Sequence, residues 1–328
     1  MSAEPIRQEA HRRSASMLRT AFGSAICEWL DDRQVIEIML NPDGLLWVDR
    51  LSIGICATSC RLNAADGERI IRLVAHHVGA EVHGRSPRVS AELPGGAGRF
   101  EGLLPPIVPA PTFAIRKPAT TVFSLADYCA SGIMSATDAA ILARAVAEQR
   151  NILIAGGTGT GKTTLANALL AEMAGTGDRI ILIEDTRELQ CTAPNCVAMR
   201  TCDGIVSLAD LVRSSLRLRP DRIPIGEVRG SEALDLLKAW GTGHPGGVGT
   251  IHAGSAQGAL LRMEQLIQEA VVTVPRSLIA ETIDLVAVLV REGAGRRLAE
   301  IATVEGLDPV TGHYRLLSHP DLQTGETP

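Results

Sequence analysis

One stretch near the middle of the chain, residues 151–164, constrains the fold more than any other feature. It reads Asn-Ile-Leu-Ile-Ala-Gly-Gly-Thr-Gly-Thr-Gly-Lys-Thr-Thr. The apolar part ends abruptly in glycine, which is typical of a buried strand, and apolar residues recur at helical spacing after Lys162. The pattern Gly156-x4-Gly161-Lys162-Thr163 between them is a P-loop in its strand–loop–helix setting. A chance glycine-rich turn is the alternative, and the flanking strand and helix argue against it.

Each part of this loop has a task in binding phosphate. Glycines let the backbone curl so that successive N–H groups point at phosphate oxygens. Lys162 would lie against the β- and γ-phosphates, the Thr163 hydroxyl would bind Mg2+, and the following helix adds its positive dipole end. We therefore predict a nucleotide site with Mg2+ bound at Thr163. The predicted nucleotide-binding residues are Gly156, Gly157, Thr158, Gly159, Thr160, Gly161, Lys162, Thr163 and Thr164.

Two acidic residues end apolar runs that follow the P-loop. Arg222-Ile-Pro-Ile-Gly-Glu227 is a Walker B-like strand, and Ile180-Ile-Leu-Ile-Glu184 is a second run of this kind. Ligands bind at the carboxyl ends of parallel strands, and hydrolysis needs an acceptor that orients a water beside the γ-phosphate. Glu227 and Glu184 are therefore catalytic candidates, although either acid alone could cap a turn. Pro224 removes a donor from its strand, so that strand is expected to be bulged or nearer to an edge.

Glycines and two histidines crowd the next predicted strand. The run is Gly241-Thr-Gly-His244-Pro-Gly-Gly-Val-Gly249-Thr250-Ile-His252. Glycines this dense are not expected as core filler, because they permit backbone rearrangement and close approach to the phosphate end of the site. His244 is a candidate sensor of the γ-phosphate, with a structural role as the alternative. Four arginines near Glu227 offer either surface ion pairs or charge to a phosphate, in this subunit or a neighbouring one: Arg217, Arg219, Arg222 and Arg229.

Local signals divide the chain into two domains. A hairpin is predicted around the turn at residues 41–44, Asp66 is expected to cap a helix as far as Val78, and residues 84–120 read as short strands. Beyond Thr137, a candidate cap, strands and helices alternate, which is typical of an α/β parallel sheet with helices on both faces. The predicted segments are a loose terminus (1–16), an α+β domain (17–117), a linker with a short helix (118–136), an α/β domain (137–310) and a tail (311–328).

The α/β pattern predicts elements at definite positions. A capping box at Ser207-x-x-Asp210 marks the start of one helix. The predicted strands are 151–155, 179–184, 222–227, 247–252, 283–290, 296–304 and 313–317. The predicted helices are 138–149, 162–173, 207–217, 231–240 and 255–270.

Composition excludes several classes of protein. With 45% hydrophobic and 21% charged residues, the chain is expected to be globular. Aromatic residues at 3% and a net charge of −5 argue against a base-stacking surface and against a general attraction to DNA or anionic lipid. Neither a signal peptide nor an apolar run of about 18 residues is present. The seven cysteines are scattered, so we expect thiols in a reducing cytoplasm rather than a zinc or disulfide framework.

Four motifs in order resemble those of the secretion traffic ATPases, and most closely the TrbB-type conjugal-transfer ATPases of type IV secretion systems. They are a Walker A box at 156–163, an Asp box at 183–188, a Walker B region at 219–230 and a His box at 243–252. Three N-terminal stretches, at 37–44, 99–102 and 113–117, are also similar to that family.

The resemblance implies a RecA-like ATPase domain preceded by a smaller α+β domain, with ATP at the cleft between them. It implies that Arg99 and Arg116 of the first domain reach the phosphates and that Lys162 stabilises them. Glu227 would orient the water, and Glu184 would support Mg2+ and water. His252 or His244 would couple the site to domain motion.

The resemblance also implies a homohexameric motor that hydrolyses ATP and works with inner-membrane components of a conjugation or type IV secretion machine. It would be cytoplasmic and peripheral at the inner membrane. A zinc-binding tetracysteine motif is absent, which favours the type IV secretion branch. The alternatives are a pilus assembly or retraction ATPase and a nucleotide-gated assembly scaffold with little turnover. Sequence-specific nucleic-acid binding is not expected, and a helicase is the least favoured class.

Overall fold

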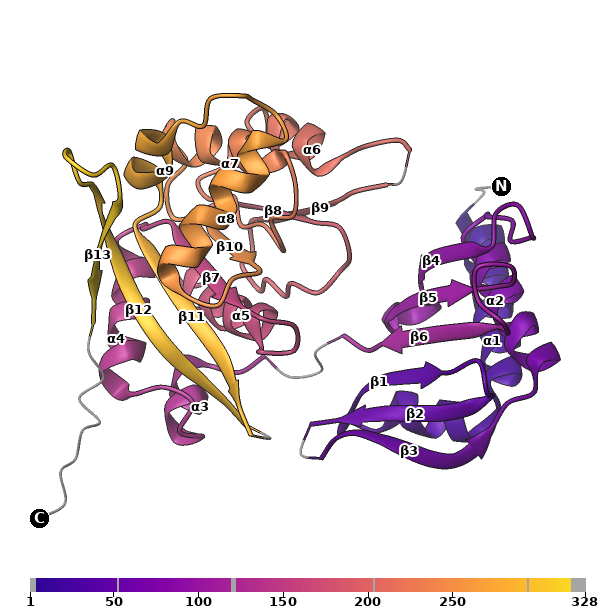
Figure 1. Cartoon of the computed structure of the whole chain (residues 1–328). Helices are drawn as coiled ribbons and strands as arrows, with labels where there is room; N and C mark the ends of the chain where they lie inside the picture. Colours follow the sequence, from indigo (N-terminus) through magenta and orange to yellow (C-terminus); the bar gives the residue numbers. More distant parts are fainter. Residues whose placement is uncertain (1–3, 52, 119–121, 203, 294, 320–328) are drawn as a thin grey trace, which may run out of the picture. The chain divides into compact units, whose positions relative to one another are not determined.

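The chain forms two compact units, Met1–Thr120 and Thr121–Pro328. The computed structural model describes residues 4–51, 53–118, 122–202, 204–293 and 295–319, with side chains from residue 15 (Figure 1). Each unit has its own sheet and its own hydrophobic core.

The first unit is an antiparallel sheet with helices on one face. The strand order is β3-β2-β1-β6-β5-β4. Alternate strand residues such as Ile38, Val48 and Phe113 are buried with the apolar side of the two helices. The elements are α1 (Glu4–Asp31), β1 (Val35–Leu40), β2 (Leu45–Arg50), β3 (Gly54–Arg61), α2 (Ala64–His77), β4 (Arg88–Glu92), η1 (Pro94–Gly96), β5 (Arg99–Leu103) and β6 (Thr112–Arg116).

The predicted hairpin joins β1 to β2, and its turn is closed by the Gly44 N–H, which donates to the Asn41 carbonyl at 2.9 Å. Other details differ from the predictions. Asn63 caps α2 by accepting from the Asp66 N–H, so Asp66 lies in the first turn rather than at the cap. Strand β3 was not predicted.

The N-terminal segment also differs from its prediction, because α1 is helical from Glu4 onward where residues 1–16 were expected to be loose. Gly23, with φ of 75°, interrupts the helix, and Leu18 and Phe22 before it and Ile26 after it are buried in the core of this unit, which anchors both parts of α1.

The second unit has a mainly parallel sheet. Strands β10, β7 and β11 are parallel neighbours, and β12 and β13 extend the sheet with antiparallel pairings. Strand β8 pairs in parallel with β9, which was not predicted. The strands are β7 (Ile152–Gly156), β8 (Ile180–Glu184), β9 (Cys196–Arg200), β10 (Val248–Ile251), β11 (Leu285–Glu292), β12 (Gly295–Leu307) and β13 (Tyr314–Ser318).

Helices cover both faces of this sheet, as predicted (Figure 1). Leu153 and Ala155 of β7 are buried with α6–α9, whereas Ile152 and Ile154 point the other way and are buried with α3–α5. The helices are α3 (Leu125–Ala130), α4 (Ala136–Ala147), α5 (Lys162–Met173), α6 (Leu208–Ser215), α7 (Glu232–Gly241), α8 (Ala256–Gln268) and α9 (Arg276–Thr282).

Serine side chains cap the starts of several helices in this unit. Ser207 and Asp210 form the predicted capping box of α6. Helix α4 begins with an equivalent box made by Ser135 and Asp138, so the cap is Ser135 rather than Thr137. Strand β13 lies within the predicted tail 311–328, of which residues 320–328 lie outside the described residues.

The predicted strand at 222–227 is instead an irregular extended segment. It lies between β8 and β10, because the Ile225 N–H donates to Val248 while the Ile183 N–H donates to Pro224, at 2.8 and 3.0 Å. Only isolated parallel bridges form along it. Pro224 has no N–H to give to the ladder, which explains the interruption. Of the two predicted alternatives, the structure therefore has the irregular strand and not the strand nearer to an edge.

Candidate functional site

The loop between β7 and α5 takes a curled path that depends on glycine. Gly159 and Gly161 have φ of 73° and 94°, in the left-handed region that favours glycine. A Cβ on Gly156 would lie 2.4 Å from the Thr160 hydroxyl oxygen and 2.6 Å from the Leu289 carbonyl oxygen. The predicted strand–loop–helix setting of the P-loop is therefore present, and its backbone path excludes side chains at these positions.

Lys162 lies in the curve of this loop. Its side chain is 8% exposed, and its Nζ donates to the carbonyl oxygens of Gly156 and Gly157 at 3.0 Å each. The loop therefore combines a cradle free of side chains with an ammonium group directed into it. Together with the N-terminus of α5, this arrangement fits a phosphate group.

Two side-chain oxygens of the kind that bind Mg2+ lie side by side at the first turn of α5. The Thr163 hydroxyl donates to Glu188 Oε2 at 3.2 Å. The Asn167 side chain holds the segment that carries this acid, because it donates to the Glu188 carbonyl and accepts from the Gln190 N–H. Hydroxyl and carboxylate oxygens suit Mg2+. Glu188 was not among the predicted site residues, although it is an acid within the Asp box.

Glu184 makes the contacts of a turn cap. It is buried at the end of β8, and its Oε2 accepts the N–H groups of Glu188 and Leu189 at 2.9 Å each. Burial raises the pKa of the Glu184 carboxyl, although these two N–H groups act in the opposite direction. These are the contacts of an acid that caps a turn, which was the alternative to a catalytic role. They hold the backbone of Glu188 in place.

Glu227, His252 and Lys162 lie together at the same edge of the sheet. Glu227 Oε1 is 2.7 Å from His252 Nε2, which is 3.5 Å from Lys162 Nζ. The second carboxylate oxygen of Glu227 pairs with Arg229, which also lies 3.7 Å from Asp185. Burial and the charge of Lys162 lower the pKa of His252, and the charge of Glu227 acts in the opposite direction. The structure thus brings a carboxylate and an imidazole to the P-loop lysine.

His244 is not part of this group. Strand β10 runs parallel to β7, and His244 precedes β10 while His252 follows it. Because β7 ends in the P-loop, only the residue after β10 lies at the P-loop edge. His244 Nδ1 is instead 2.9 Å from the Pro220 carbonyl oxygen. Of the two histidines, His252 is therefore the one that lies beside the P-loop lysine.

Arg99 and Arg116 are neighbours in the first unit. They are directly opposite each other on β5 and β6, and Arg116 is also opposite Glu37 of β1. Burial raises the pKa of Glu37, and the charge of Arg116 opposes that shift. Like charges on facing positions of a sheet repel each other. The two positive charges gathered here suit an anionic ligand, and the contribution of Arg99 and Arg116 to the P-loop site stays a prediction.

Comparison with known proteins places the chain in a family. The family described as Type II/IV secretion system protein matches residues 86–305. The conjugal transfer protein TrbB of Rhizobium radiobacter is 48% identical over 316 residues, which cover 96% of this chain and 97% of that protein. The chain belongs to the type II/IV secretion system protein family. The resemblance stated from the four motifs is therefore confirmed.

One further relative and one solved structure are also similar to this chain. The type IV secretion system protein VirB11 of Bartonella quintana is 31% identical over 285 residues, covering 75% of this chain and 80% of that protein. The structure of the Yersinia pseudotuberculosis ATPase DotB matches with a TM-score of 0.61 and 19% identity, covering 85% of this chain and 78% of that chain. The second match supports the fold.

The glycine-rich part of the His box has a different role in this secretion-system protein from the one predicted. A Cβ on Gly247 would lie 2.1 Å from two atoms of the Trp240 indole, and one on Gly249 would lie 3.2 Å from the same ring. The indole is 2% exposed, and its Nε1 donates to the Ile223 carbonyl at 2.9 Å. These two glycines therefore make room for a core tryptophan.

The four arginines near Glu227 separate into different roles. Arg222 is 1% exposed, and its guanidinium donates to Asp178 at 2.6 Å and to the Val146 carbonyl at 2.7 Å. Arg222 therefore forms a buried structural ion pair with Asp178 and is not available to bind a phosphate. Arg229 pairs with Glu227, whereas Arg217 and Arg219 are exposed on the surface.

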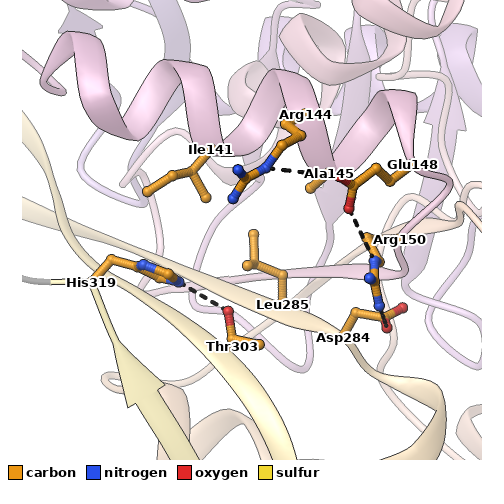
Figure 2. Close-up of a pocket in the computed structure, with 9 residues that line it drawn as sticks. All are labelled: Ile141, Arg144, Ala145, Glu148, Arg150, Asp284, Leu285, Thr303 and His319. Carbon is orange, nitrogen blue, oxygen red and sulfur yellow. Dashed lines mark hydrogen bonds and ion pairs between the residues drawn. The ribbon is translucent and has the colours of Figure 1, made fainter.

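A cavity of about 200 Å³ lies at the opposite edge of the sheet, where β7 and β11 begin (Figure 2). Its charged groups are paired with one another. Arg150 is 3.1 Å from Asp284 and 3.4 Å from Glu148, which Arg144 approaches at 3.9 Å. His319 lies across the cavity and contacts a threonine hydroxyl. None of the predicted site residues lines this cavity.

Proposed function

We propose that this chain is an ATP-hydrolysing motor subunit that energises a type IV secretion or conjugative DNA-transfer apparatus. The observation that carries this proposal is the position of Glu227, which is 15% exposed and lies 2.7 Å from His252 beside Lys162. A carboxylate at this place orients the water that attacks the γ-phosphate in line. The similarity to the conjugal transfer protein TrbB over nearly the whole of both chains supports the conjugal role.

The residues at the P-loop divide the chemistry among them. Lys162 and the loop N–H groups stabilise the charge that develops on the transferred phosphoryl group. Thr163 and Glu188 offer oxygens to Mg2+, which when bound neutralises charge on the β- and γ-phosphates. His252 Nε2 lies between the water-orienting carboxylate of Glu227 and the Lys162 ammonium group, 2.7 Å from the first and 3.5 Å from the second.

The finer parts of the proposal extend beyond the P-loop unit. The parallel sheet with helices on both faces supports a RecA-like ATPase domain over residues 137–310. Arg99 and Arg116 of the first domain approach the phosphates of bound ATP, and a homohexamer works with inner-membrane components at the cytoplasmic face. Every helix among the described residues is too short or too polar to cross a lipid bilayer.

The rate of ATP hydrolysis tests the motor proposal directly. Glu227→Gln keeps the shape of the side chain but removes its charge, so kcat is expected to fall at least about 100-fold while ADP still binds. Glu172→Gln, an exposed acid on α5, makes the same change away from the site and is expected to turn over normally. Turnover in the wild type no higher than in Glu227→Gln would instead support the scaffold.

The particle mass tests the ring. Mass photometry with and without ATP and Mg2+ is expected to reveal a hexamer in at least one nucleotide condition. A strict monomer under every condition contradicts the ring.

A further inference from the structure

An arginine from a distant hairpin lies against the P-loop. Arg296 is the second residue of β12, and its Nε donates to the Gly159 carbonyl oxygen at 3.1 Å, across 137 residues of sequence. A Cβ on Gly161 would lie 3.2 Å from Arg296 Cδ. The side chain of Arg296 therefore packs over both left-handed residues of the loop. It lies outside the four motifs.

The place of this hairpin is set by the strand that carries the P-loop. Strand β11 pairs in parallel with β7, so that Leu289 lies opposite Gly156. The antiparallel partner β12 then returns along β11 and brings Arg296 beside the loop. The sheet register thus fixes the backbone of Arg296 next to the P-loop, and the side chain only has to span the remaining distance to Gly159.

The contact with Gly159 complements the function of the loop. When P-loop N–H groups point at phosphates, the carbonyl groups point away from them and need other partners. Arg296 satisfies one such carbonyl and brings a permanent positive charge. Among the described residues its terminal nitrogens have no ion-pair partner, so that charge is not neutralised by a neighbouring carboxylate.

We propose that Arg296 is a positioning residue of the nucleotide site. It holds the P-loop in its phosphate-accepting form and adds positive charge beside a bound nucleoside di- or triphosphate. This inference rests on the proposed function, because it concerns the same loop. It assigns the β11–β12 hairpin a part in nucleotide affinity.

Binding of ADP with Mg2+, measured by titration calorimetry at two salt concentrations, tests this role. Arg296→Gln is expected to raise Kd about tenfold, or about 1.4 kcal/mol, and to weaken the dependence of Kd on salt. Arg296→Lys keeps the charge but loses the planar fork, so its Kd should lie between the two. Arg297→Gln is the matched control, because Arg297 is adjacent on the strand, points to the other face and pairs with Glu292.

Two further measurements separate the possible failures. Thermal unfolding without nucleotide is expected to be the same for the wild type and Arg296→Lys, which excludes a general loss of structure. If Arg296→Gln binds ADP as tightly as the wild type and with the same salt dependence, while Lys162→Ala does not bind, the inference is wrong and the proposed function stands. If the wild type itself does not bind ADP, the proposed function fails and this inference fails with it.

Discussion

An alanine at position 247 is expected to destabilise the second unit, because its methyl group has no room. The Cβ would lie 2.1 Å from Cε2 and Nε1 of Trp240 and 2.6 Å from Cζ2. The indole is rigid and buried, and its Nε1 is held by the Ile223 carbonyl at 2.9 Å. The ring must therefore move and strain this hydrogen bond if the methyl group is to fit.

The cost follows from two contributions. Overpacking a core typically costs about 1–3 kcal/mol. Leaving the Ile223 carbonyl without its buried donor costs about 1–3 kcal/mol more. Taken together, the overpacking and the lost hydrogen bond are expected to lower the free energy of unfolding by about 3 kcal/mol. For a unit of this size, that loss lowers Tm by about 6–12 °C.

Differential scanning calorimetry of the full chain measures this shift. Gly254→Ala is the matched control, because a Cβ at Gly254 meets no atom within 4 Å, and its Tm is expected to stay near that of the wild type. In a Trp240→Leu background, Gly247→Ala should cost less than it does alone, since the clash is with the indole. If Gly247→Ala unfolds like the wild type but binds ADP weakly, the glycine serves the phosphate site and the packing argument is wrong.

Three other predictions follow from the same contacts. His252→Ala is expected to lower kcat for ATP by at least about tenfold, and His244→Ala to leave it unchanged, in a steady-state ATPase assay. Glu188→Gln should raise the Mg2+ concentration for half-maximal ATPase activity by about tenfold, as a Mg2+ titration will show. Asp178→Ala should cost about 3–5 kcal/mol in urea unfolding, because it leaves Arg222 buried without its partner. Burial alone would raise the pKa of Asp178, but hydrogen bonds hold it below its ordinary value, so this stability is present above about pH 4 and is lost as the pH falls further.

Much of the α/β unit could be predicted from local patterns. The P-loop, the alternation of strands and helices and the box at Ser207 each depend on residues close in sequence, and the structure has all three. The position of Glu227 beside His252 could be predicted as well, because an acid after an apolar run is a local signal of the end of an extended segment.

The errors arise where a contact joins residues distant in sequence. The glycines at 247 and 249 looked like parts of the phosphate site because nothing local reveals that Trp240 fills the space beside them. Arg222 looked available for a phosphate until the fold buried it against Asp178. Glu188 was missed because the choice among the three acids of the Asp box depends on which of them reaches Thr163.

The direction of the strands explains which residues of each motif meet. Strand β8, the segment at 222–226, β10 and β7 lie side by side and run in parallel. The residues at their carboxyl ends, which belong to the four motifs, therefore meet at one edge of the sheet. Lys162 and His252 approach within 3.5 Å although 90 residues separate them. Residues before the same strands, such as His244, lie at the other edge. In a parallel sheet, a residue is therefore a better candidate for the binding site when it lies at the carboxyl end of a strand, and this position matters more than its residue type. That criterion is readable from sequence, and applied to β10 it separates His252 from His244 without a structure.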